Sequence, residues 1–191
     1  MRHGLFVIGS RNEFAELAPV LIRAADAGVK YDIWNTGQAG DALDDLVTGL
    51  GGGARVTLRG AAPTGSPAIG WWLRAMAGCY SHVHSLKTWT RAAPLVIVRG
   101  VSASSLVGAI AGRSGGGWVV QLDSGTDSGS WYEGIVCRLT NFALCPDETA
   151  YVRMRRFHCK AVNLAEAGEG ATCAGGARAG QVVDRLRDWS R

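Results

Sequence analysis

The sequence predicts a doubly wound α/β domain built on a mainly parallel sheet. Short apolar runs alternate along the chain with longer segments whose apolar residues recur at helical spacing, which is the pattern of repeated βα units. One run, Leu95-Val96-Ile97-Val98, is apolar throughout, as expected for a parallel strand buried on both faces. Glycines and small polar residues follow several of the runs, as in the loops at the carboxyl ends of such strands. Together these observations favour a Rossmann-like domain.

The expected elements follow from the same alternation. Strands are expected at residues 5–8, 31–34, 54–58, 95–98, 118–122 and 142–145. Helices are expected at residues 13–27, 39–50, 66–91, 104–113, 131–140 and 147–158. In the first helix Gly28 is placed to end the segment, and Pro19 lies inside it, where proline removes a hydrogen bond and can bend the helix.

We expect one domain over residues 1–164, a linker rich in glycine and alanine at 165–180, and a short C-terminal helix at 181–191. The apolar residues of that helix share one face, and they are Val182, Val183, Leu186 and Trp189. Two positions are open for this face, against the domain or against another chain.

The composition fits a globular protein with a buried core, because 47% of the 191 residues are hydrophobic and 19% are charged. No apolar run approaches the roughly 20 residues that a membrane-spanning helix needs, and no signal-peptide-like run follows Met1, so we expect a cytoplasmic protein with no membrane span. The five cysteines form no C-x-x-C pair and have no histidine at zinc spacing. We expect them to be buried thiols, and we predict neither a metal site nor another cofactor.

The basic residues do not form one long block, although the net charge is +4. The densest cluster comprises Arg153, Arg155 and Arg156, followed by His158 and Lys160. A solvated helix face is the simpler interpretation of this cluster, and a phosphate or RNA contact is the alternative. No nucleic-acid partner is predicted for the chain.

The longest expected helix is rich in aromatic residues. Trp71, Trp72 and Trp89 lie at spacings that predict core or interface packing rather than a ligand platform. His82 and His84 are two residues apart, so they cannot face one ligand from a helix, and they are expected at the surface.

Four loops follow the expected strands, at the edge of the sheet where ligands bind in such folds. They cover residues 9–13, 35–41, 99–105 and 123–129. Each offers small residues close to a helix N-terminus, which together suggest a ligand that carries phosphate. The same residue types are also ordinary turn and cap residues. Neither G-x-G-x-x-G nor G-x-x-x-x-G-K-[ST] is present, which disfavours a standard dinucleotide site or P-loop.

Several motifs in these loops resemble one family. Gly9-Ser10-Arg11-Asn12-Glu13 is similar to the G-T-R-P-E signature of the non-hydrolysing UDP-N-acetylglucosamine 2-epimerases, and Leu17-Ala18-Pro19-Val20 to the M-A-P-L that follows it there. Further motifs resemble T-G-Q-H-x-x-M-L, H-G-D-T, P-E-E-x-N-R-x-L-T and A-P-T-E, in this order, at residues 36–43, 99–102, 133–140 and 145–148. The order of the motifs makes the resemblance more specific than any one of them.

The resemblance implies a glycosyltransferase-B-like architecture, in which two Rossmann-like domains close on a UDP-sugar and serve polysaccharide biosynthesis. This chain resembles only the first domain. The resemblance therefore implies a UDP-sugar as ligand, and either a second polypeptide or a homodimer as partner of an impaired, half-length protein. A structural descendant without a ligand is a further alternative.

The family reaction removes UDP and adds it back after protonation at C2, which requires an acid and a base. At the corresponding positions the aspartate of H-G-D-T is Val101, the second glutamate of P-E-E is Gly134, and a lysine of the family is Glu16. Asp123 matches a family glutamate and Glu133 lies beside the position that lost one, so both are the candidate catalytic residues. Each acid or base contributes about 10²–10⁴-fold, so we expect stand-alone epimerase activity to be impaired or absent.

The candidate substrate-binding residues are Gly9, Ser10, Arg11, Gln38, Ser102 and Ser104. Arg11 comes first, because the resemblance places it near the UDP phosphates and a guanidinium fork suits phosphate oxygens. A surface salt bridge from Arg11 to Glu13 or Glu16 is the alternative. The serines are equally suited to be plain helix caps, and Asp123 to be a turn residue.

Overall fold

A single parallel sheet organises the molecule. The computed structural model describes residues 2–37, 46, 55–56, 69–126, 131–157, 159–164 and 176–190. The described strands pair in the order β3-β2-β1-β4-β5-β6-β7, and every pair is parallel. Their bounds are β1 Gly4–Ile8, β2 Tyr31–Asn35, β3 Arg55–Val56, β4 Leu95–Arg99, β5 Trp118–Leu122, β6 Phe142–Cys145 and β7 Lys160–Asn163. The doubly wound, mainly parallel fold is confirmed.

Strand β7 was not predicted. It forms the edge of the sheet, where it pairs with β6 only, and its residues are half-buried or exposed. Its sequence, Lys160-Ala161-Val162-Asn163, lacks the apolar run of the buried strands. A lysine is a frequent residue on strands that end a sheet, because it discourages pairing with another chain.

The helices agree with the expected segments to within a few residues. They are α1 Arg11–Asp26, α3 Ile69–Thr90, α4 Ala103–Ser114, α5 Trp131–Leu139, α6 Glu148–Met154 and α7 Gly176–Ser190, with a 3₁₀ turn, η2, at Arg155–Phe157. Helix α1 continues through Pro19 and is followed by Gly28, whose φ of 69° suits the residue after a helix end. Of the helix expected at 39–50, only Leu46 is described, and it is helical.

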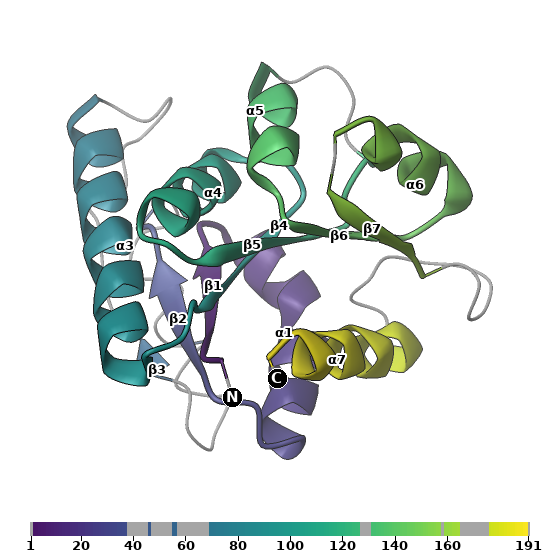
Figure 1. The fold of residues 1–191 in the computed structure, drawn as a ribbon, viewed down its shortest axis with the longest axis horizontal. Coiled ribbons are helices and arrows are strands. Elements are labelled where there is room, and N and C mark those ends of the chain that lie inside the picture. Colours follow the sequence, from purple (N-terminus) through teal and green to yellow (C-terminus); the bar gives the residue numbers. More distant parts are fainter. Residues whose placement is uncertain are drawn as a thin grey trace.

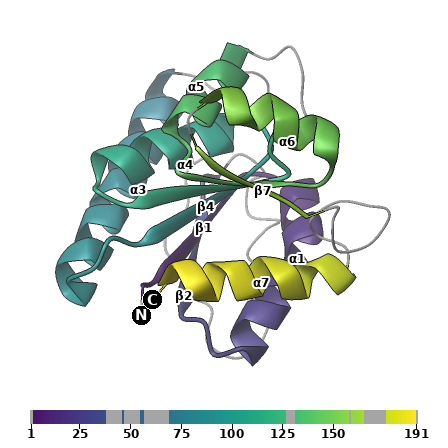
Figure 2. The same cartoon turned by 45° about the vertical axis from the view of Figure 1, so that its right-hand side comes forward.

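Helices cover both faces of the sheet (Figures 1 and 2). The strands alternate in the faces they present: Phe6 and Ile97 join the core on the side of α1 and α7, whereas Val7 and Val98 join the core on the side of α3, α4 and α5. This two-sided burial explains why the central strands are apolar throughout. Helix α4 lies so close to the sheet that a Cβ on Gly108 would stand 2.6 Å from the Val98 side chain.

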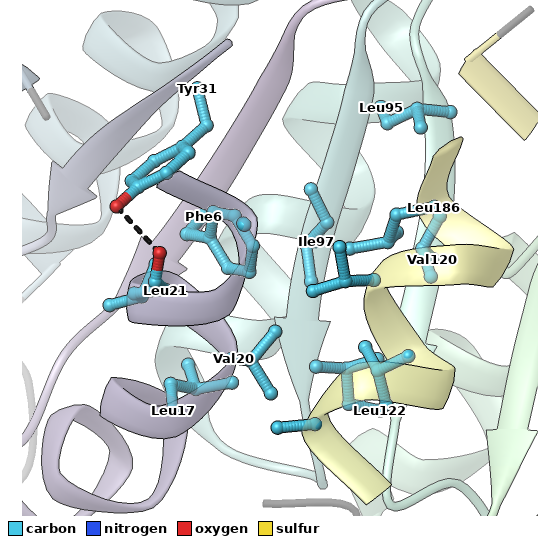
Figure 3. Packing of buried hydrophobic residues seen from close by; sticks show 14 of the residues in the cluster. Phe6, Leu17, Val20, Leu21, Tyr31, Leu95, Ile97, Val120, Leu122 and Leu186 are labelled. Carbon is cyan, nitrogen blue, oxygen red and sulfur yellow. Dashed lines mark hydrogen bonds between the residues drawn. The ribbon is translucent and has the colours of Figure 1, made fainter. Parts of the chain in front are cut away.

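The C-terminal helix α7 packs on this domain, which decides between the two positions that the sequence left open. Figure 3 shows Leu186 of α7 among Leu17 and Val20 of α1 and Val120 and Leu122 of β5. The helix begins at Gly176, five residues before the expected start, so residues 176–180 of the predicted linker are helical and 165–175 lie outside the described residues. Among the described helices, none is long and apolar enough to cross a membrane.

Candidate functional site

The order of the strands reverses between β1 and β4. Strands β2 and β3 lie on one side of this point, and β4 to β7 lie on the other. After β1 the chain passes into α1 on one face, and after β4 it passes into α4 on the opposite face (Figure 1). In doubly wound folds ligands bind at the carboxyl ends of the strands at such a switch point. The predicted loops after β1, β4 and β5 therefore share the edge at which a site is expected.

The loop after β1 is closed by a reciprocal helix cap. The Ser10 hydroxyl accepts a hydrogen bond from the Glu13 amide at 3.1 Å, and Glu13 Oε2 accepts one from the Gly9 amide at 2.7 Å. The Gly9 amide thus already has an anionic partner within the chain. Arg11, by contrast, is exposed, and no described contact pairs it with Glu13 or Glu16. The sequence left two interpretations of Arg11, a phosphate contact or a surface salt bridge to Glu13 or Glu16. The structure contains no such salt bridge.

The serines after β4 are engaged in the loop itself. Ser102 caps α4, and its hydroxyl accepts from the Ser105 amide at 3.0 Å. Ser104 is fully buried, and its hydroxyl lies 2.9 Å from the Thr36 hydroxyl after β2. The cap interpretation therefore holds for Ser102, and Ser104 links two of the predicted loops.

A charged triad joins three elements at this edge. The Nε of Arg99, the last residue of β4, donates to Asp123 Oδ2 at 2.6 Å, and its Nη1 pairs with Glu16 Oε2 of α1. The side chains of Arg99 and Asp123 are 17% and 5% exposed, whereas that of Glu16 is 43% exposed. Asp123 adopts a left-handed backbone conformation, with φ of 53°. The carboxylate predicted as a residual base is therefore an ion-pair partner.

Sequence reasoning did not single out Arg99, although a signal was present. It is a charged residue that ends an otherwise apolar, buried strand, where a side chain needs a partner. It lies beside Leu122 in the register of β4 and β5, which brings its guanidinium next to Asp123.

Gln121 is a second supporting residue that the sequence did not indicate. It is fully buried in β5, and its amide nitrogen donates to the Gly100 carbonyl at 3.0 Å. Its amide oxygen accepts from the Thr140 hydroxyl at 3.1 Å. Gly100 itself has a φ of 54°, which favours glycine. Gln121 therefore holds the loop after β4 in place.

Glu133, the other candidate catalytic residue, lies on the first turn of α5 and is half-buried. Cys137 follows one turn later on the same helix face. Burial, and then the negative charge of Glu133, raises the pKa of Cys137 to about 12. The candidate Gln38 lies outside the described residues, as do residues 127–130 between Asp123 and α5.

In the arginine cluster after β6, Arg155 and Arg156 are exposed, as expected for a solvated face, whereas Arg153 is half-buried. Arg153 Nη1 donates to the Gly125 carbonyl at 2.8 Å, which ties α6 to the loop after β5. Arg153 and Arg156 also line a cavity of about 480 Å³, together with Glu148. His158 lies outside the described residues.

The prediction of buried thiols is confirmed for Cys79, Cys137 and Cys145, whereas Cys159 is half-buried and Cys173 lies outside the described residues. Burial raises the pKa of each of the three buried thiols to about 12. Within the described ranges, no three histidine, cysteine or acidic side chains are placed to hold a metal ion.

No protein family model matches the chain, and no curated protein matches it in sequence. Solved structures match it in fold. A UDP-GlcNAc 2-epimerase from Neisseria meningitidis, bound to UDP-GlcNAc, has a TM-score of 0.66 at 16% identity, over 84% of this chain and 46% of that one. The enzyme from Methanocaldococcus jannaschii has a TM-score of 0.64 at 14% identity, over 99% and 52%.

A third match is the Anabaena protein HepE in complex with UDP and glucose, with a TM-score of 0.56 at 14% identity, over 85% of this chain and 44% of that one. The chain thus spans about half the length of the solved structures that it matches. At these identities the likeness establishes the fold, and function has to be argued from the site. The chain has the doubly wound α/β fold of one half of a UDP-GlcNAc 2-epimerase.

Proposed function

We propose that the chain binds a UDP-sugar at the switch point and does not epimerise it on its own. The observation that carries this proposal is the position of Arg11, an exposed cation beside the capped loop Gly9-Ser10 and the N-terminus of α1. An arginine fork at a helix N-terminus is suited to phosphate oxygens. The solved structures of similar fold that hold UDP-GlcNAc, or UDP and glucose, support a ligand of this class.

The state of the candidate catalytic residues supports binding without turnover. Asp123 is buried and paired with Arg99, so its carboxylate is engaged within the chain. Glu133 lies on the face of α5 that carries Cys137. Val101 and Gly134, at the positions of two family carboxylates, have no group that transfers a proton. The acid and the base that epimerisation requires are therefore not assembled by this chain.

The first test measures the affinity of UDP and UDP-GlcNAc by isothermal titration calorimetry. We expect binding at micromolar to millimolar ligand, and a loss of about tenfold or more in Arg11→Ala, because a charge-assisted contact to phosphate is removed. Arg23→Ala is the matched control, since Arg23 is an exposed arginine near the other end of α1. We expect it to bind as the wild type does.

Two outcomes contradict the proposal. One is no binding of UDP at millimolar concentration, and the other is equal affinity in Arg11→Ala and Arg23→Ala. An epimerase assay on the isolated chain completes the test, because measurable conversion of UDP-GlcNAc would disprove the claim that it does not epimerise alone.

A second candidate function is a non-catalytic subunit that a second polypeptide, or a second copy, completes. The observation in its favour is an apolar surface shared by α3 and α5. Ile69 and Leu73 of α3 and Trp131 of α5 are exposed, and the rings of Trp72 and Tyr132, 6.3 Å apart, join the two helices. An apolar patch of this kind is typical of interaction surfaces.

Light scattering on the purified chain tests the second candidate. Self-association that is lost in Leu73→Ser would support it. A monomer that also fails to bind the separately produced second half of a similar epimerase would contradict it.

A further inference from the structure

Arg99 meets its two carboxylate partners in different environments. Asp123 is almost fully buried and holds Nε at 2.6 Å, whereas Glu16, which pairs with Nη1, is 43% exposed. The guanidinium is thus anchored on one side by a partner that cannot leave. The partner on its other side, Glu16, is exposed enough for its carboxylate to rotate toward the solvent.

We infer that Glu16 occupies the position of a ligand's phosphate at Arg99, so that an anionic ligand has to displace it. This inference rests on the proposed function and specifies how the same site is regulated. Arg99 becomes a second phosphate contact beside Arg11, and Glu16 becomes a competitor that the chain supplies itself.

The geometry of the guanidinium supports this assignment. Arginine has five N–H donors in a planar fork, and Asp123 engages only the Nε side. The anchored side chain is already ordered, so a phosphate that replaces Glu16 meets a preorganised donor. Glu16 lies on α1 five residues after Arg11, so Arg99 meets α1 within the first two turns of the helix.

The charge balance of the edge points the same way. This edge holds two cations, Arg11 and Arg99, and three carboxylates, Glu13, Glu16 and Asp123. Asp123 is anchored by Arg99, and Glu13 is engaged by the Gly9 amide. Glu16 is the most exposed carboxylate of the charged triad, and its departure frees Arg99 Nη1 for another anion. An incoming diphosphate therefore gains most from its departure.

The test compares Glu16→Gln with Asp26→Asn by calorimetric titration with UDP. Both variants remove one negative charge from α1, but Asp26 is exposed at the far end of the helix. An exposed ion pair is worth at most about fivefold in an equilibrium constant, so we expect Glu16→Gln to bind UDP about threefold to fivefold more tightly than the wild type. Asp26→Asn should stay within about twofold, because charges separated by more than a Debye length are largely screened.

Inorganic pyrophosphate serves as a second probe. A similar gain in Glu16→Gln shows that Glu16 competes with the phosphate groups, and no gain with this probe overturns the inference. The double variant Glu16→Gln/Arg99→Lys should lose the gain, because lysine has no fork with which to hold Asp123 and a phosphate together. Circular dichroism confirms that each variant is folded.

The outcomes separate this inference from the proposed function. If the wild type and Glu16→Gln bind UDP equally, or Glu16→Gln binds it more weakly, the inference is wrong and the proposed function stands. If none of the variants binds UDP or pyrophosphate at millimolar concentration, both are wrong.

Discussion

Two buried aspartates lie at different places in the same sheet, and their partners differ in kind. Asp32, near the start of β2, has His82 Nε2 at 2.9 Å and His3 Nε2 at 3.3 Å, although the contact with His3 lacks the alignment of a hydrogen bond. Asp123, just after β5, has Arg99 Nε at 2.6 Å. Each carboxylate links elements that are distant in the sequence.

The difference lies in what the partners do when the pH changes. Histidine titrates near neutral pH, whereas arginine stays charged throughout the range in which proteins fold. Burial alone would raise the pKa of Asp32, but the two imidazoles that contact its carboxylate lower it well below its usual range. The pair at the candidate site therefore keeps its cation across this range, whereas the stabilisation from Asp32 depends on pH.

The largest effect is expected where the pair of Arg99 and Asp123 is broken. Arg99→Met leaves Asp123 buried without its cation, so we expect the free energy of unfolding to fall by about 3 kcal/mol. Urea denaturation measures it. Arg99→Met/Asp123→Asn should recover part of the loss, because no buried charge remains. A loss below about 1 kcal/mol in Arg99→Met would show that Asp123 does not need this partner.

A smaller effect, with a pH dependence, is expected at the other aspartate. Asp32→Asn removes a carboxylate that two imidazoles contact. We expect the free energy of unfolding to fall by about 1–2 kcal/mol near pH 6. Folding lowers the pKa of Asp32, so the folded state binds fewer protons and the stabilisation is present above about pH 4, the unfolded value. As the pH falls below about 4, the wild type should lose this advantage over the variant.

Urea denaturation of the wild type and of Asp32→Asn from pH 3 to 8 measures the gap between their free energies of unfolding. The gap should narrow on the acidic side, where the Asp32 carboxylate of the folded state is progressively protonated. A gap that does not change below pH 4 would contradict the role assigned to Asp32.

The smallest effect separates two histidines on α3. His82 contacts Asp32, whereas His84 is exposed and stacks on Tyr80. We expect His82→Asn to cost about 1 kcal/mol near pH 6 and His84→Asn less than about 0.5 kcal/mol. Thermal denaturation of the two variants measures both. Equal costs would mean that the contact with Asp32 adds no stability.

The histidines also show where sequence reasoning stopped. Their spacing correctly excluded a shared ligand, but the surface position expected for His82 is wrong, because Asp32 of β2 lies against it. Nothing local marks this contact, since the two residues are 50 positions apart. The edge strand β7 was missed for a related reason, because a half-buried strand with Lys160 and Asn163 has no apolar run.

The sequence by itself determined the doubly wound architecture, the central strands and the loops at which a site is expected. It could do so because helix and strand periods, strand burial and cap residues are local properties of the chain. Only the tertiary structure decided which charges neutralise one another. Glu16, Arg99 and Asp123 meet because the strand order puts β1, β4 and β5 side by side, and an ion pair depends on distance in space rather than on distance along the chain.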